Sequence, residues 1–216
     1  MSNPSLIPSW GDSTDKRIRL CAMEATTSEA TIREFLRRLG HTVAIVARKP
    51  IGHARPVVLW PDDLTGGAHI SARRLAPDYD AVFVNLNPLK PAYLKDAQPL
   101  GTSIRRSMIA RITRLLIDLD SQGSTKAEAY RQMEVIRAEL RQPLMATDSG
   151  NGHALIYPVD LPVESYPRVV AFLKKLKERY SCVDPSVGTP ERLTRLIGTF
   201  NRDKLTGERI QTCLLT

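Results

Sequence analysis

Two aspartates, Asp118 and Asp120, lie inside an apolar run of the sequence, RITRLLIDLDSQGS, which covers residues 111–124. Alternate side chains of a β-strand point to the same face, so this spacing places both carboxylates on one face. Neighbouring carboxylates repel each other and lose hydration, which costs free energy unless their charge is compensated. Mg²⁺ or Mn²⁺ compensates it directly, because both ions prefer hard oxygen ligands. Alternatively, the two aspartates end the strand and cap the following turn.

A second group of polar residues lies in the segment TDSGNGHALIY, residues 147–157. Ser149, Asn151 and the neighbouring glycines offer a hydroxyl and exposed amides in a tight turn, a shape that suits a phosphate group. His153 begins the next predicted strand and is placed to donate a hydrogen bond to a phosphate oxygen. Asn-Gly turns and histidines at strand ends are also common surface features, so the segment alone leaves both interpretations open.

A third carboxylate, Asp184, lies in the segment SCVDPSVGTPERLTRLIGTFNRDK. Asp184 follows an apolar pair and precedes Pro185, so it stands at the end of a predicted strand, as Asp118 and Asp120 do. It can therefore complete a metal site of three carboxylates. The alternative is that Asp184 only caps the turn that follows it.

Two arginines follow in the same segment. We predict a short helix over residues 191–198, opened by Pro190, which would place Arg192 and Arg195 three positions apart on one helical face. Two guanidiniums directed at one place suit a phosphate group or a template backbone. The alternative is that both arginines are solvated.

Helices and strands alternate loosely around these candidate residues. Apolar residues recur with helical spacing in residues 26–40, 124–142 and 162–180, with Ser124 as the expected cap of the second helix. The Asn-Gly turn near residue 151 indicates a β-hairpin. Strands are predicted over residues 41–49, 56–60, 80–91, 111–120, 144–150, 153–161 and 209–216, with a short strand that runs into a turn over residues 181–187. This order favours an α+β fold with a mixed sheet covered by helices over a doubly wound parallel sheet.

In this order, the three segments resemble the catalytic core of the archaeo-eukaryotic primase superfamily, and most of all the primase-polymerases of phages, plasmids and mobile elements. That family carries an hhhDhD strand, an S-x-H-like segment and an hD strand end, which fall here at LLIDLD, SGNGH and CVD. The spacing of Ser149 and His153 is similar to an SGNGxH-type variant. RLTRLIGTFNRDK and AVFVNLNPLKP also resemble the flanking segments of the family, and the likeness covers roughly residues 80 to 205.

The resemblance implies a two-lobed core, in which an RRM-like sheet carries the acidic residues and an amino-terminal lobe completes a nucleic-acid cleft. Residues 1–16 are polar and are predicted to be flexible. Residues 17–216 are expected to form one catalytic domain, with lobes at about 17–80 and 81–216. The implied activity is that of a DNA primase-polymerase: template-directed, metal-dependent nucleotidyl transfer on single-stranded DNA, as primer synthesis, DNA extension or both.

The resemblance also assigns roles to particular residues. Asp118, Asp120 and Asp184 are expected to hold two Mg²⁺ or Mn²⁺ ions near an incoming triphosphate. The residues expected to contact the NTP or dNTP are Ser149, Asn151, His153, Arg192, Arg195, Asn201 and Lys204. The residues expected to follow the template backbone are Arg73, Arg74, Arg105 and Arg106.

The excess of basic residues agrees with an anionic partner. Lys and Arg number 31 against 23 Asp and Glu, a net charge of +8. Such an excess suits nucleic acid or nucleotides, although it also serves solubility. Single-stranded DNA is therefore the expected partner, and the resemblance adds a replicative helicase and other replication or CRISPR-operon proteins as candidates.

Several kinds of site and location are not expected. The three cysteines form no CxxC pair, so we expect no zinc. No secretory signal is recognisable and no apolar run is long enough to cross a bilayer, so we expect a cytoplasmic protein with no membrane partner.

Two other classes of function stay open on the sequence alone. A metal-dependent nuclease or replication initiator also uses an acidic metal site. The four histidines form no His-hydrophobe-His pair, which disfavours a nickase of that type. A non-catalytic nucleic-acid-binding module needs the basic residues but has no need of all three aspartates.

Overall fold

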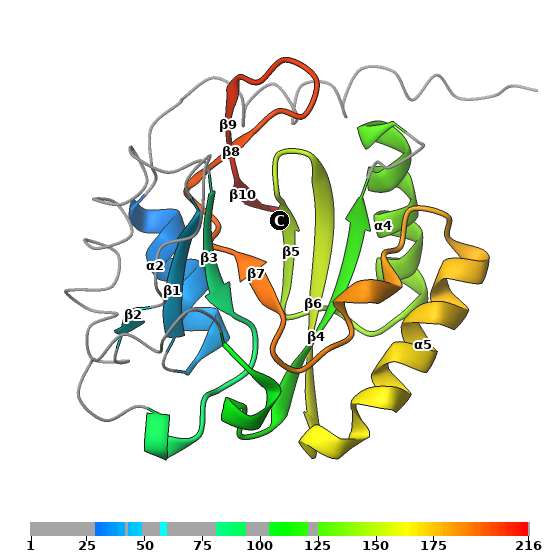
Figure 1. The fold of residues 1–216 in the computed structure, drawn as a ribbon. Coiled ribbons are helices and arrows are strands. Elements are labelled where there is room, and N and C mark those ends of the chain that lie inside the picture. The colour runs from blue at the N-terminus through cyan, green and yellow to red at the C-terminus, as the bar shows by residue number, and fades with distance from the viewer. Residues whose placement is uncertain are drawn as a thin grey trace, which may run out of the picture.

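The predicted α+β fold is confirmed by the computed structural model (Figure 1). The structure describes residues 29–41, 43–48, 57–59, 81–93, 104–120 and 125–215. Within these ranges the strands form two four-stranded sheets and one two-stranded ribbon. Every strand pairing among the described residues is antiparallel. The predicted flexible segment, together with Arg73 and Arg74, lies outside the described residues.

The first sheet has the strand order β2-β1-β3-β7. Helix α2, Glu29–Leu39, buries the apolar stripe that its sequence predicts, including Ile32, Phe35 and Leu36, in the core that this sheet also enters. The strands of this sheet are β1 (Val43–Arg48), β2 (Val57–Leu59), β3 (Ala81–Asn85) and β7 (Leu193–Arg195). Strand β3 pairs with β1, and β7 pairs with β3, so both strands extend the sheet that contains β1 and β2. They come from the sequence range that was expected to form the second lobe.

The second sheet has the strand order β10-β5-β6-β4 and carries two helices, α4 and α5, on one side (Figure 1). Its strands are β4 (Ile112–Asp120), β5 (Met145–Asp148), β6 (Gly152–Leu161) and β10 (Cys213–Leu215), and its helices are α4 (Lys126–Glu139) and α5 (Tyr166–Arg179). Strands β5 and β6 form the predicted hairpin. The side chain of Thr125 caps α4 and accepts a hydrogen bond from the Glu128 amide, whereas the predicted cap, Ser124, lies outside the described residues.

Short elements connect the sheets. Strands β8 (Phe200–Arg202) and β9 (Arg209–Gln211) pair as the ribbon. The 3₁₀ turns are η3 (Pro91–Tyr93), η5 (Arg106–Met108), η6 (Val163–Ser165) and η7 (Pro185–Val187).

The predicted helix over residues 191–198 is wrong. Leu193–Arg195 form strand β7, which pairs with β3 so that Arg195 lies opposite Phe83. A short helix is only marginally stable by itself, whereas the open edge of β3 supplies backbone hydrogen bonds and a buried neighbour. The tertiary pairing therefore decides the conformation of this segment.

One continuous hydrophobic core joins the two sheets, because the same cluster of buried side chains contains residues from α2, both sheets, α4 and α5. The buried Asn87 connects their strands. Its Oδ1 accepts hydrogen bonds from the amides of Thr113 and Arg114 at 2.8 and 2.9 Å, and its Nδ2 donates to the Pro190 carbonyl at 3.1 Å. Asn87 thereby fixes the start of β4 relative to the segment that enters β7.

Among the described residues, no helix combines the length and the apolar character that crossing a bilayer requires.

Candidate functional site

Asp118 and Asp120 project from the same face of β4, as the sequence predicts. Ile117 and Leu119 point to the other face and are fully buried, which anchors the strand. On the neighbouring strand β6, Gly152 lies opposite Asp120. A Cβ atom at Gly152 would lie 2.5 Å from the Leu119 carbonyl oxygen, so only glycine lets β6 approach β4 this closely beside the carboxylates.

Asp184 is brought beside Asp118 by the backbone. The segment that follows α5 runs along the open edge of β4, where the Asp184 amide donates to the Asp118 carbonyl at 2.8 Å and the Asp120 amide donates to the Cys182 carbonyl at 3.0 Å. The Asp184 carboxylate accepts hydrogen bonds from the amide and the hydroxyl of Ser186, at 2.9 and 2.8 Å. The three predicted acidic residues therefore lie on adjacent segments.

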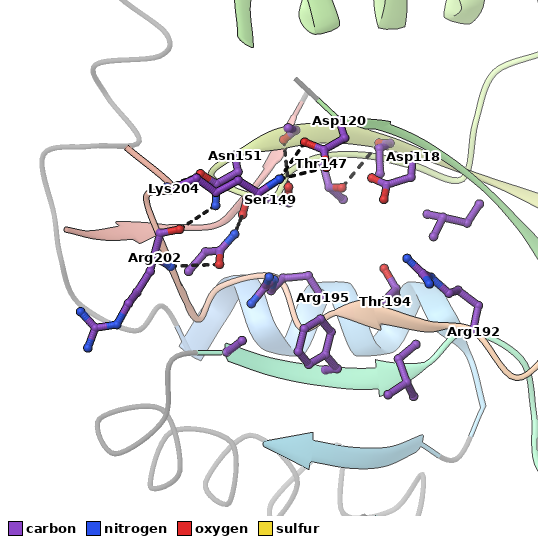
Figure 2. A pocket seen from close by; sticks show the side chains of 17 residues that line it. Asp118, Asp120, Thr147, Ser149, Asn151, Arg192, Thr194, Arg195, Arg202 and Lys204 are labelled. Atoms are coloured by element: carbon purple, nitrogen blue, oxygen red, sulfur yellow. Dashed lines mark hydrogen bonds and ion pairs between the residues drawn. The ribbon is translucent and has the colours of Figure 1, made fainter. Parts of the chain in front are cut away.

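Arginines from the first sheet face Asp118 and Asp120 across a cavity of about 460 Å³ (Figure 2). Arg195 is on β7, and its guanidinium lies 4.5 Å from the ring centroid of Phe83 on β3, a cation–π contact. Arg192 immediately precedes β7 and lines the same cavity. The predicted site residues that line it are Asp118, Asp120, Ser149, Asn151, Arg192, Arg195, Asn201 and Lys204.

The turn between β5 and β6 is fastened to the segment around β8. Asn201 Nδ2 donates to the Ser149 carbonyl at 2.6 Å, and Asn151 Nδ2 donates to the Arg202 carbonyl at 2.6 Å. Asn151 Oδ1 accepts from the Lys204 amide at 3.0 Å. Lys204 Nζ in turn contacts both carboxylate oxygens of Asp120, at 3.0 and 2.9 Å. One network thus positions these polar side chains around the cavity.

The electrostatics of the site centre on Asp118. The pKa of its carboxyl group is raised from 3.8 to about 6, chiefly by burial, with a contribution in the same direction from the neighbouring charges of Asp184 and Asp120. Arg192 and Arg195 act in the opposite direction and lower the pKa of Asp118. The Asp118 carboxylate is therefore only partly compensated by the protein and favours the approach of additional positive charge.

His153 does not reach the cavity. It lies opposite Leu119 in the β4–β6 pairing, so its side chain is on the face that carries α4, where its ring packs edge-on against Tyr130 with centroids 5.3 Å apart. Burial lowers the pKa of His153 to about 4, which keeps the ring neutral at physiological pH. The β6 residue that lies beside Asp118 and lines the cavity is Ala154. This placement does not fit the predicted phosphate contact from His153.

The predicted template residues Arg105 and Arg106 do not line the carboxylate cavity. Arg106 pairs with Glu191 at 3.3 Å, and its guanidinium lies 3.8 Å from the ring centroid of Tyr166. Arg105 is exposed beside it, at the start of η5. These two arginines therefore belong to a surface separate from the cavity.

A metal site can be tested against the donors present. Carboxylate oxygens are the ligands that Mg²⁺ and Mn²⁺ prefer, and the raised pKa of Asp118 shows a carboxyl group short of positive charge. In the described part of the chain, however, no three His, Cys, Asp or Glu side chains converge closely enough to hold a metal ion. Lys204 engages Asp120 and Ser186 engages Asp184, which directs these two carboxylates to protein donors.

Several cavity residues have no role in the sequence prediction. Thr147, Thr194 and Arg202 line the cavity, and Phe83 lies beneath Arg195. A signal for Thr147 exists in the sequence, because it stands two residues before Ser149 in the same predicted strand. Phe83 and Thr194 have no such signal, since their positions depend on the pairing of β3 with β7.

The fold resembles that of the RepB′ primase catalytic domain. The crystal structure of primase RepB′ matches with a TM-score of 0.59 at 14% identity, covering 87% of this chain and 56% of that one. The crystal structure of the catalytic domain of primase RepB′ in complex with initiator DNA matches with a TM-score of 0.58 at 15% identity, covering 88% of this chain and 85% of that one. This chain thus spans little more than half of the longer RepB′ chain. Neither a model of a known protein family nor a curated protein matches the sequence.

Proposed function

We propose that this chain is a cytoplasmic DNA primase-polymerase of the phage, plasmid or mobile-element type. It catalyses template-directed nucleotidyl transfer on single-stranded DNA, with Mg²⁺ or Mn²⁺ as cofactor and NTP or dNTP as substrate. The observation that carries the proposal is the cavity between the sheets, where carboxylates of β4 face the arginines at β7. The shared fold of the RepB′ catalytic domain, which was crystallised with initiator DNA, supports it.

The basic wall of the cavity suits a triphosphate. Arg192, Arg195 and Lys204 line it, together with the amide side chain of Asn201. Guanidiniums bind phosphate oxygens in a planar, two-pronged geometry, and the Phe83 ring holds the Arg195 guanidinium in place. In this proposal these side chains neutralise the triphosphate and orient its α-phosphorus toward β4.

The carboxylates on the opposite wall suit the divalent ions that the same reaction requires. Asp118, Asp120 and Asp184 would hold the divalent ions, which requires Lys204 to leave Asp120. When bound, such ions supply the Lewis acidity that activates the attacking hydroxyl and neutralises the leaving pyrophosphate. The 3′-oxygen forms a bond to the α-phosphorus, the bond from that phosphorus to the β-phosphate breaks, and the hydroxyl proton passes to water.

One assay tests this function directly. The purified chain is incubated with single-stranded DNA, labelled nucleotides and Mn²⁺ or Mg²⁺, with and without a primer. We expect labelled products longer than the primer, or short new products without one, from the wild type but not from Asp118→Asn or Asp120→Asn. The matched control is Asp160→Asn, an exposed carboxylate paired with Arg111 on the rim of the second sheet.

The other outcomes point to different functions. Shortened template without synthesis would identify a nuclease or an initiator. DNA binding without either product would identify a non-catalytic binding module. Either result overturns the proposal.

A further inference from the structure

A second cavity, of about 260 Å³, lies on the other side of Asp120. Asp120 lines both cavities, whereas Asp118 lines only the first and Asp184 only the second. The acidic residues therefore form a partition with space on each side. The second space is bounded by the end of α5 and by η7, which Figure 1 shows beside β4.

The two cavities differ in the positive charge that they offer. Three cationic side chains, those of Arg192, Arg195 and Lys204, line the first cavity, whereas the Arg202 guanidinium points away from it and donates to the Gly207 carbonyl (Figure 2). Among the described residues that line the second, Lys177 is the single cation. A nucleoside triphosphate carries about four negative charges, and a phosphodiester carries one, so each cavity matches a different one of the two substrates of nucleotidyl transfer.

The walls of the second cavity are fixed by local hydrogen bonds. Lys177 Nζ donates to the Ser181 carbonyl, which holds the ammonium over the segment that leads to Asp184, and two of its three donors remain for a ligand. Ser186 donates to Asp184 through both its amide and its hydroxyl. A polar ligand therefore meets an ordered ammonium on one side and an ordered carboxylate on the other.

We propose that the second cavity receives the 3′-terminal sugar and phosphodiester of the strand being extended, and that Lys177 pairs with this phosphodiester. The inference rests on the proposed function. In-line transfer requires the 3′-hydroxyl to approach the α-phosphorus from the side opposite the leaving pyrophosphate. A triphosphate in the first cavity places that side at Asp120, where the second cavity opens. Lys177 is then a substrate-binding residue for the growing strand.

The test is a steady-state extension assay on a recessed primer–template with Mn²⁺, comparing the wild type, Lys177→Ala and Lys177→Arg. The matched control is Lys175→Ala, an exposed lysine of the same helix that does not line this cavity. For Lys177→Ala we expect the KM for the primer terminus to rise about five- to tenfold, the scale of one lost charge-assisted contact, with the KM for the nucleotide changed less than about twofold. In Lys177→Arg, which keeps the positive charge, we expect the KM for the primer terminus to return most of the way to the wild-type value.

A primer with a methylphosphonate at its last linkage removes the charge from the DNA instead of the protein. With this primer we expect the primer KM of the wild type to rise about as much as the primer KM of Lys177→Ala rises with the normal primer. The modified primer should raise the KM of Lys177→Ala little further, as coupled partners do in a double-mutant cycle. The inference is overturned if the modified primer raises the primer KM of both proteins equally, or if Lys177→Ala leaves the primer KM unchanged. In either case, primer extension by the wild type still supports the proposed function. No extension by the wild type overturns both.

Discussion

Asp118 links the stability of the fold to pH. Its pKa is about 6 in the folded protein and 3.8 in its ordinary state. Between these pH values the folded chain keeps a proton on Asp118 that the unfolded chain has lost, so the stability contributed by this residue falls as the pH rises. The unfavourable effect of the carboxylate is absent below pH 3.8 and complete above about pH 6.

Asp118→Asn keeps the shape of the side chain and removes the charge. We expect the variant to melt about 2–4 °C or more above the wild type at pH 7.5 in EDTA, because about 1 kcal/mol shifts the Tm of a protein of this size by that amount. The difference should shrink as the pH falls toward 4. Thermal melts over this pH range measure it, with Asp160→Asn as the control, and a lower Tm of Asp118→Asn at pH 7.5 would contradict the assignment.

His153 behaves in the opposite way. Its pKa falls from 6.5 to about 4 on folding because the ring is buried, so the folded state resists protonation and stability is lost as the pH drops through this window. His153→Leu removes this loss. We expect the stability of the variant relative to the wild type to improve between pH 6.5 and 4.5, measured by denaturant melts.

The same variant tests where the His153 ring lies. Because the ring is on the α4 face, we expect the nucleotide KM of His153→Leu to stay within about twofold of the wild type. A tenfold loss of nucleotide affinity without loss of stability would place His153 at the triphosphate after all.

At the scale of elements, the approach of β6 to β4 depends on Gly152. A methyl group there would lie 2.5 Å from the Leu119 carbonyl oxygen, so Gly152→Ala must push the strands apart beside Asp120. We expect a loss of about 1–3 kcal/mol in the free energy of unfolding, the usual range for overpacking, together with a loss of nucleotide affinity. Denaturant melts and nucleotide titrations measure the two effects.

Gly207→Ala is the matched control for this prediction. Gly207 has a φ of +72° and no other atom within 4 Å of the added Cβ, so alanine there costs only backbone strain, about 1–2 kcal/mol. We expect Gly207→Ala to lower stability and leave nucleotide affinity unchanged. If both variants retain full affinity, the β4–β6 spacing does not control the site.

The elements differ in how far their sequence predicts them. Asp118 and Asp120 could be placed on one face because alternation within a strand is local information, and the same holds for the apolar stripe of α2. Arg192 and Arg195 could not be placed correctly, because their segment has helical spacing and becomes a strand only by pairing with β3. The sequence still predicted that both arginines converge on the site, but it placed them on one face of a helix, whereas the structure places them at a β-strand.

The position of His153 shows the limit of pattern reasoning most clearly. Whether a β6 side chain faces the carboxylates depends on the register between β6 and β4, and a shift of one residue exchanges the two faces. The sequence gives no direct reading of that register. Lys177 and Ser186 were missed for a similar reason, because α5 and η7 reach Asp120 only in the folded chain.

At the scale of the whole molecule, the net charge of +8 predicts how DNA binding responds to salt. Each phosphate contact with a single strand contributes a slope of about −0.7 to the plot of log K against log salt concentration. About three contacts would therefore weaken binding roughly twentyfold between about 50 and 200 mM salt. Fluorescence anisotropy of a labelled oligonucleotide measures this slope.

The control for the salt dependence is Asp120→Asn, which removes a negative charge. It should bind single-stranded DNA at least as tightly as the wild type, because it leaves the basic surface intact. Binding that does not change with salt would exclude a phosphate-dominated interface.

The ion pair between Lys204 and Asp120 gives the site an internal competitor. The Lys204 amide donates a hydrogen bond to Asn151, so the fold itself holds the Lys204 ammonium beside the Asp120 carboxylate. A monovalent ion that replaced this ammonium would bring no additional charge, whereas a divalent ion brings one more. In the proposed metal site, Na⁺ and K⁺ would therefore gain nothing by displacing the ammonium, and the ion pair would make the site selective for divalent ions.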